Sequence, residues 1–141
     1  MDTNKVRDFV NKAVERTKCN ELTWIALPDC FDLKPVSDTF RNTGIDELSG
    51  YKLIPFYSYY SQYKSGFILL LLFSDDITLT TPPNNCILSL RVQDDTSKLA
   101  IEISNNQFDP VDDSLLIRLY NLVDSTRMSS VRSLLNDFLD G

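Results

Sequence analysis

The segment Lys52–Asp76 reads KLIPFYSYYSQYKSGFILLLLFSDD, and it decides which folds are open to this chain. Its first half contains four of the chain's six tyrosines, and its second half contains seven consecutive apolar residues, Phe67–Phe73. A membrane-spanning helix needs about 20 apolar residues, and here Asp75 and Asp76 end the run. A membrane strand would be longer and would alternate polar with apolar residues. We therefore interpret the run as a β-strand in a protein core.

Alternate residues of a strand point to opposite faces of its sheet. The odd-numbered members of the run would take one face, and Ile68, Leu70 and Leu72 would take the other. Both faces are apolar, so both need a cover, and helices at the two ends of the chain are expected to cover one of them. The second face then needs either residues 28–52 or another subunit. Three exposed aliphatic side chains would otherwise forgo about 1.5–3 kcal/mol each.

Periodicity in the flanking sequence predicts helices and strands of a mixed α+β domain. Residues 4–18 have the apolar spacing of an amphipathic helix, and Asn20 is a suitable helix stop. Gly66 is expected to supply the positive φ of a hairpin turn. In the strand after that hairpin, Ser89 and Arg91 face away from the apolar side. The predicted strands cover residues 22–27, 56–63, 66–73, 86–92 and 98–104.

The C-terminal third predicts two further helices. Asp109 and Pro110 have the pattern of an N-cap followed by the first helical residue, and Ser125–Arg127 is predicted to separate this helix from a last one at about 128–139. The fold class is therefore α+β. We expect an antiparallel sheet of about five to six strands, with the N-terminal helix and the two C-terminal helices packed on one face. The length predicts a single domain, residues 1–141.

Composition excludes several classes of function. The net charge is −6, which disfavours nucleic acids and anionic membranes as partners. The chain has no histidine, the commonest general base and metal ligand, and no phosphate-binding glycine motif is present. Adjacent acidic pairs such as Asp94-Asp95 fit turns rather than catalytic pairs. The sequence predicts a protein that is not an enzyme and that has no cofactor or metal.

The cysteines and the N-terminus concern the cellular compartment. Cys19, Cys30 and Cys86 are odd in number and match no zinc or redox spacing, so free thiols in a reducing environment are expected. The first ten residues have a polar, helical pattern rather than that of a signal peptide. A cytoplasmic location is the expectation.

Four stretches of the chain resemble one family. They are ELTW (21–24), YKSGFILLLLF (63–73), LLIRLYNLVDST (115–126) and VRSLLNDFLD (131–140). In these stretches the chain resembles a diffuse family of small uncharacterised proteins from Gram-positive bacteria. The resemblance implies a similar fold plan and a bacterial cytoplasmic setting. It implies no assigned activity and no catalytic residues.

Two functional hypotheses follow from these features. The first is a non-enzymatic protein-interaction module that forms a homodimer through an apolar sheet face bordered by tyrosines. The second is a small-ligand binding domain in which residues 28–52 close over a pocket at the sheet. If this long stretch is not such a flap, we expect it to contain a short helix at 36–43 or 45–48. The candidate interface or pocket residues are Tyr57, Tyr59, Tyr60, Tyr63, Ile68, Leu70, Leu72 and Trp24.

Overall fold

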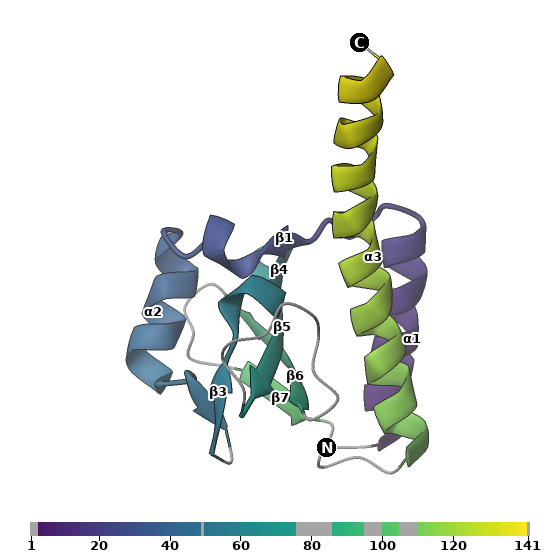
Figure 1. Cartoon of the computed structure of the whole chain (residues 1–141). Coiled ribbons are helices and arrows are strands. Elements are labelled where there is room, and N and C mark those ends of the chain that lie inside the picture. Colours follow the sequence, from purple (N-terminus) through teal and green to yellow (C-terminus); the bar gives the residue numbers. More distant parts are fainter. Residues whose placement is uncertain (1–2, 49, 76–85, 95–99, 105–109, 141) are drawn as a thin grey trace.

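The computed structural model describes residues 3–48, 50–75, 86–94, 100–104 and 110–140 (Figure 1). In chain order its elements are α1 (Thr3–Lys18), β1 (Ile25–Ala26), the 3-10 turn η1 (Leu27–Asp29), α2 (Lys34–Thr43), β2 (Glu47–Leu48), β3 (Tyr51–Leu53), the 3-10 turn η2 (Pro55–Tyr57), β4 (Tyr59–Tyr63), β5 (Gly66–Ser74), β6 (Cys86–Asp94), β7 (Ala100–Ser104) and α3 (Pro110–Asp140). The α+β class and the antiparallel sheet are confirmed. Within the described residues the sheet has seven strands, because short pieces of the 22–53 region join it.

The apolar run forms β5, the central strand of the sheet. β6 pairs antiparallel with β5 over its whole length, from Gly66↔Asp94 to Ser74↔Cys86. On its other edge β5 pairs first with β4 and then with β3. Where these two neighbours meet, the Ser58 hydroxyl accepts a hydrogen bond from the Leu72 amide at 3.0 Å. Both edges of β5 are therefore paired, and its position in the sheet interior is as predicted.

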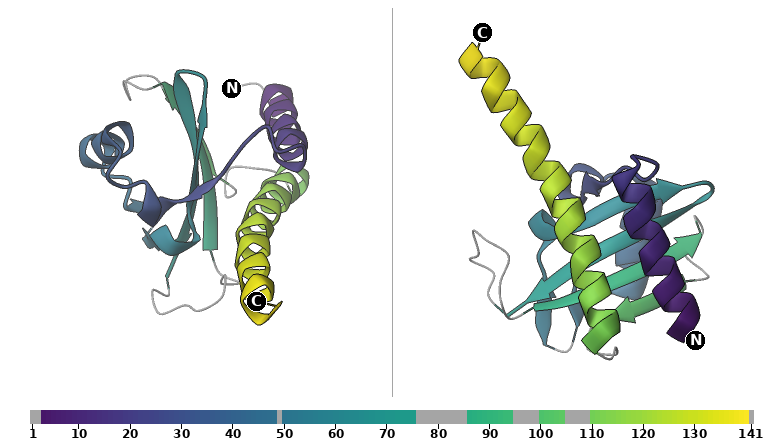
Figure 2. Two further views of the ribbon diagram at one scale, coloured as in Figure 1. Left: turned by 90° about the horizontal axis from the view of Figure 1, so that it is seen from above. Right: turned by 90° about the vertical axis from the view of Figure 1, so that its right-hand side faces the viewer.

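One face of the sheet is covered by α1 and α3 (Figure 2). The even-numbered residues of β5 lie in a core cluster with Val10 of α1 and with Leu116 and Leu119 of α3, all of them buried. Leu88 and Leu90 of β6 join this cluster. The amphipathic N-terminal helix therefore packs as its spacing predicts, and it ends near Asn20, whose φ of 59° is left-handed.

The opposite face of the sheet is covered by the 27–53 segment. The odd-numbered residues of β5 pack in a second buried cluster with Leu27, Cys30 and Val36. Figure 2 shows α2 on the side of the sheet opposite α1 and α3. Residues 28–52 thus contain a helix, at 34–43. The second face of the sheet is covered by this chain itself and not by another subunit.

A chain of polar side chains joins α2 to this face. The Gln93 side-chain amide donates to the Thr39 hydroxyl at 2.7 Å, and the Arg91 guanidinium donates to Gln93 at 2.5 Å. Arg91 also pairs with Glu102 of β7. Arg91 is buried. Glu102 compensates its charge, and Gln93 accepts one of its hydrogen bonds.

The β4–β5 turn corrects one expectation. Lys64, not Gly66, has the positive φ, at 53°. Gly66 is needed for another reason, because a Cβ placed there would lie 2.6 Å from the carbonyl oxygen of Gln93 on β6. The glycine therefore permits close approach of two strands rather than an unusual turn conformation.

The C-terminal segments form one continuous helix. Both predicted stretches are helical, but no break separates them at Ser125–Arg127. The hydroxyls of Ser125 and Thr126 donate to the carbonyls of Leu122 and Val123, which keeps these polar residues within the helix. The expected N-cap, Asp109, lies outside the described residues. The last turns of α3 extend beyond the sheet (Figure 1).

Candidate functional site

The expected interface residues on β5 lie inside the chain's own core. Ile68, Leu70 and Leu72 are buried beneath α1 and α3. A second subunit could reach them only if both helices moved away from the sheet. The sequence correctly paired these residues on one face, but it did not indicate that the helices would choose that face. This corrects the expected location of an interface.

The four tyrosines near β5 separate onto different surfaces. Tyr57 and Tyr59 are buried in the cluster beneath the helices, whereas Tyr60 is buried on the α2 side. Tyr63 is partly exposed, and its hydroxyl accepts a hydrogen bond from Arg16 of α1 at 2.6 Å. This hydrogen bond lowers the pKa of Tyr63. The tyrosines therefore do not form the border of a common surface.

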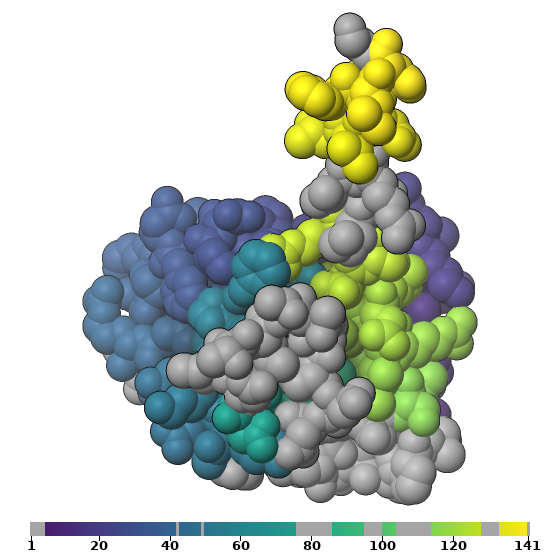
Figure 3. Space-filling model, in the orientation of Figure 1, coloured from purple at the N-terminus to yellow at the C-terminus, as the bar shows by residue number. Residues whose placement is uncertain are grey.

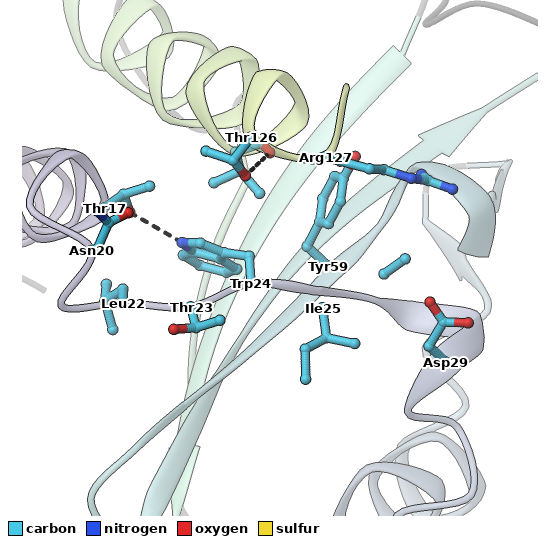
Figure 4. A pocket seen from close by; sticks show the side chains of 12 residues that line it. Thr17, Asn20, Leu22, Thr23, Trp24, Ile25, Asp29, Tyr59, Thr126 and Arg127 are labelled. Carbon is cyan, nitrogen blue, oxygen red and sulfur yellow. Dashed lines mark hydrogen bonds between the residues drawn. The ribbon is translucent and has the colours of Figure 1, made fainter. Parts of the chain in front are cut away.

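A pocket of about 450 Å³ lies where the chain passes from α1 to β1, beside the middle of α3 (Figure 4). Trp24 and Tyr59 are the two candidate residues that the structure brings together here. The pocket does not lie under the 28–52 segment, of which it contacts Asp29. The lining residues are Thr17, Asn20, Leu22, Thr23, Trp24, Ile25, Ala26, Asp29, Tyr59, Val123, Thr126 and Arg127.

Hydrogen bonds fix the side chains around this pocket. The Trp24 indole donates to the Thr17 hydroxyl at 3.0 Å, and the Tyr59 hydroxyl donates to Asp124 at 2.5 Å. Burial, reinforced by the hydrogen bond to Asp124, raises the pKa of Tyr59 to about 12. Tyr59 therefore stays neutral near pH 7.

Arg127 lines the pocket, and contacts with Phe56 hold its side chain in position. Its guanidinium donates to the carbonyl of Phe56 at 2.5 Å and lies 4.1 Å from the centre of the Phe56 ring. Both contacts come from η2, the turn just before β4. Sequence reasoning missed Arg127 because it placed this residue in a break between two helices.

The end of α3 is the second surface that the sequence did not single out as a site. Residues 133–140, here called the α3 tip, are all exposed. Figure 3 shows the tip standing clear of the body of the molecule. Its large apolar side chains are Leu134, Leu135, Phe138 and Leu139, with 73, 55, 82 and 70% of their surface exposed. At 100° per residue these four share one side of the helix, and the polar residues share the other.

No group of three or more His, Cys, Asp or Glu side chains in the described part of the chain could hold a metal ion. No disulfide joins Cys19, Cys30 and Cys86, as predicted. Burial, with Asp29 and Asp32 adding to it, raises the pKa of the Cys30 thiol to about 11, so this thiol stays protonated and unreactive near pH 7.

Comparison with protein-family models, curated proteins and solved structures found no match. The resemblance to small proteins of Gram-positive bacteria therefore stays a prediction. Among the described helices, none combines the length and the hydropathy that crossing a membrane requires.

Proposed function

We propose that this chain is a non-enzymatic protein-interaction module that forms a homodimer through the α3 tip. The observation that carries the proposal is the exposure of the four large apolar side chains of the tip on one side of a helix. Contiguous exposed apolar surface of this kind is uncommon on proteins that act alone and is typical of interaction sites.

The energy available from the tip is of the size that a reversible dimer needs. The exposed parts of the four side chains together amount to roughly three whole side chains, and burying each contributes about 1.5–3 kcal/mol. Two copies would then supply about 9–18 kcal/mol. Association costs about 4–15 kcal/mol. The difference between these ranges includes about 8 kcal/mol, which corresponds to a micromolar dissociation constant, and we propose a reversible dimer of that affinity.

A second copy is the occupant that best fits the chemistry of the tip. The same apolar stripe on both copies is complementary to itself, as a two-fold interface requires. The tip carries the acidic residues Asp137 and Asp140, and its last turn has no basic side chain. Antiparallel pairing keeps the carboxylates of the two copies apart and opposes the two helix dipoles, whereas parallel pairing would bring the carboxylates together and align the dipoles. We therefore propose an antiparallel pair of α3 tips.

A lipid surface fits the tip less well. Helices that lie on membranes usually carry Lys and Arg on their polar side, but the polar side of the tip consists of Ser133, Asn136, Asp137 and Asp140. The net charge of −6 adds repulsion from anionic lipids. Protein association is therefore the better explanation of the exposed stripe.

Light scattering coupled to size-exclusion chromatography tests the proposal. The full chain is examined from about 1 to about 200 µM, a range that brackets a micromolar dissociation constant. We expect the mass to rise from that of a monomer to twice that value. The double substitution Leu134→Gln with Phe138→Gln should hold the protein monomeric over the whole range.

Leu33→Gln is the matched control, because Leu33 is also an exposed leucine but lies beside α2. It should dimerise like the unmodified chain. A monomer at every concentration would refute the homodimer, and a double variant that still dimerises would refute the assignment of the interface to the tip.

A further inference from the structure

The pocket beside Trp24 has the volume of a small-molecule site. Its volume of about 450 Å³ lies within the range of about 300–1,000 Å³ that ligand sites occupy. Its walls come from the end of α1, from the chain that continues through β1 to η1, from β4 and from α3 (Figure 4). The α3 tip is not part of it, so the pocket is independent of the proposed dimer.

One wall of the pocket is apolar and rigid. Trp24, Ile25 and Val123 line it, and the indole is held in place by its hydrogen bond to Thr17. Thr17 in turn donates to the carbonyl of Ala13 in α1, at 2.7 Å. An apolar ligand group could therefore lie against an indole face that is already oriented, which lowers the entropic cost of binding.

The pocket also presents two opposite charges that do not neutralise each other. Figure 4 shows the guanidinium of Arg127 and the carboxylate of Asp29 on the same side of the pocket, one on α3 and the other on η1. Among the described residues no ion pair within 4.0 Å joins these two groups. Arg127 is held by Phe56, so its position does not depend on a ligand.

We propose that this pocket binds a free α-amino acid with a large apolar side chain. The ligand carboxylate pairs with Arg127, whose planar guanidinium suits a carboxylate. The ligand ammonium lies toward Asp29, and the side chain packs on Trp24. A molecule that carries only one of the two charges forms only one of these two ion pairs, and this difference gives the site its specificity.

The single tryptophan of the chain makes the site directly observable. L-leucine, which does not absorb near 295 nm, is titrated into the full chain while Trp24 fluorescence is followed. Two analogues serve as comparisons: 4-methylpentanoate, which lacks the ammonium, and 3-methylbutylamine, which lacks the carboxylate. We expect a saturable change with leucine and an affinity at least about ten-fold weaker for each analogue.

Substitutions then assign each charge to its protein partner. Asp29→Asn should remove the preference for leucine over 4-methylpentanoate, and Arg127→Gln should remove the preference for leucine over 3-methylbutylamine. Asp32→Asn is the control, because Asp32 is exposed on the same segment but does not line the pocket. It should bind all three probes as the unmodified chain does.

Three results would overturn the proposal. One is the absence of a saturable change in Trp24 fluorescence with leucine at up to about 10 mM, a concentration well above the dissociation constant of a specific site. Another is equal affinity for leucine and both analogues. The third is an Asp29→Asn variant that keeps the full preference over 4-methylpentanoate. Circular dichroism of Arg127→Gln shows whether α3 stays folded, and the Asp29 result stands without it because the Asp29 side chain is exposed.

Discussion

Replacing Leu71 by alanine tests whether this chain covers both faces of β5 by itself. Leu71 is completely buried in the cluster on the α2 side, next to Leu27 and Val36. The substitution removes three carbon atoms, worth about 2.4 kcal/mol at about 0.8 kcal/mol each. If a cavity of about 50 Å³ remains, it adds about 1.2 kcal/mol at about 24 cal/mol per Å³. We expect a total loss of about 3.5 kcal/mol in the free energy of unfolding.

Urea unfolding measures this loss, with the protein at about 1 µM so that dissociation of a micromolar dimer does not contribute. Leu70→Ala, on the face beneath α1 and α3, should cost a similar amount because Leu70 is equally buried. Leu139→Ala, at the exposed α3 tip, should change the stability by less than about 0.5 kcal/mol. A loss below about 1 kcal/mol for Leu71→Ala would mean that the 27–53 segment does not pack on the sheet.

Three further predictions concern single side chains in the sheet. The buried Ser61 hydroxyl has no hydrogen-bond partner among the described residues, so Ser61→Ala should raise the free energy of unfolding by about 1 kcal/mol in urea; a loss of that size would contradict the prediction. Gly66→Ala forces a Cβ to 2.6 Å from the Gln93 carbonyl oxygen and should lower the midpoint of thermal unfolding, at a cost of about 1–3 kcal/mol. The pKa of Tyr59 is raised to about 12 in the folded chain, against about 10 in the unfolded chain. The stabilisation that neutral Tyr59 gives the fold is therefore complete below pH 10 and is lost as the pH rises from 10 to 12. Titration at 295 nm should accordingly show one phenol ionising near pH 12 that is missing in Tyr59→Phe.

The sequence predicted the parts of the fold that depend on local periodicity. An apolar run with no polar alternation must be buried on both sides, and this placed β5 correctly in the sheet interior. The alternation around Arg91 likewise predicted which residues of β6 face away from the helices. These patterns report the distance between neighbouring residues on one element, which is a local property.

Which segment covers each apolar face of the strand depends on contacts between residues far apart in the sequence. The periodicity of the sequence does not specify those contacts. Both sides of β5 are apolar, so no pattern in the run distinguishes the side that receives α1 and α3 from the side that receives α2. The stripe at Phe138 has the same spacing as a core-facing helix, and we expected it to pack on the sheet. Arg127 and Asp29 are more than 90 residues apart in the sequence, so only the folded chain could bring them to one pocket.

The covering of both sheet faces also determines where self-association can occur. A partner that bound at Leu70 would have to displace α1 and α3 from the sheet. The apolar surface exposed by that displacement would be as large as the surface that the partner buries. The α3 tip has no such competition, because none of its described side chains is buried. Leu70→Asp should therefore unfold the monomer, whereas Phe138→Gln should change the mass in solution and leave the unfolding of the monomer unaltered. If instead Phe138→Gln destabilised the monomer in dilute solution, the tip would have to fold back on its own body, and its role in a dimer would be excluded.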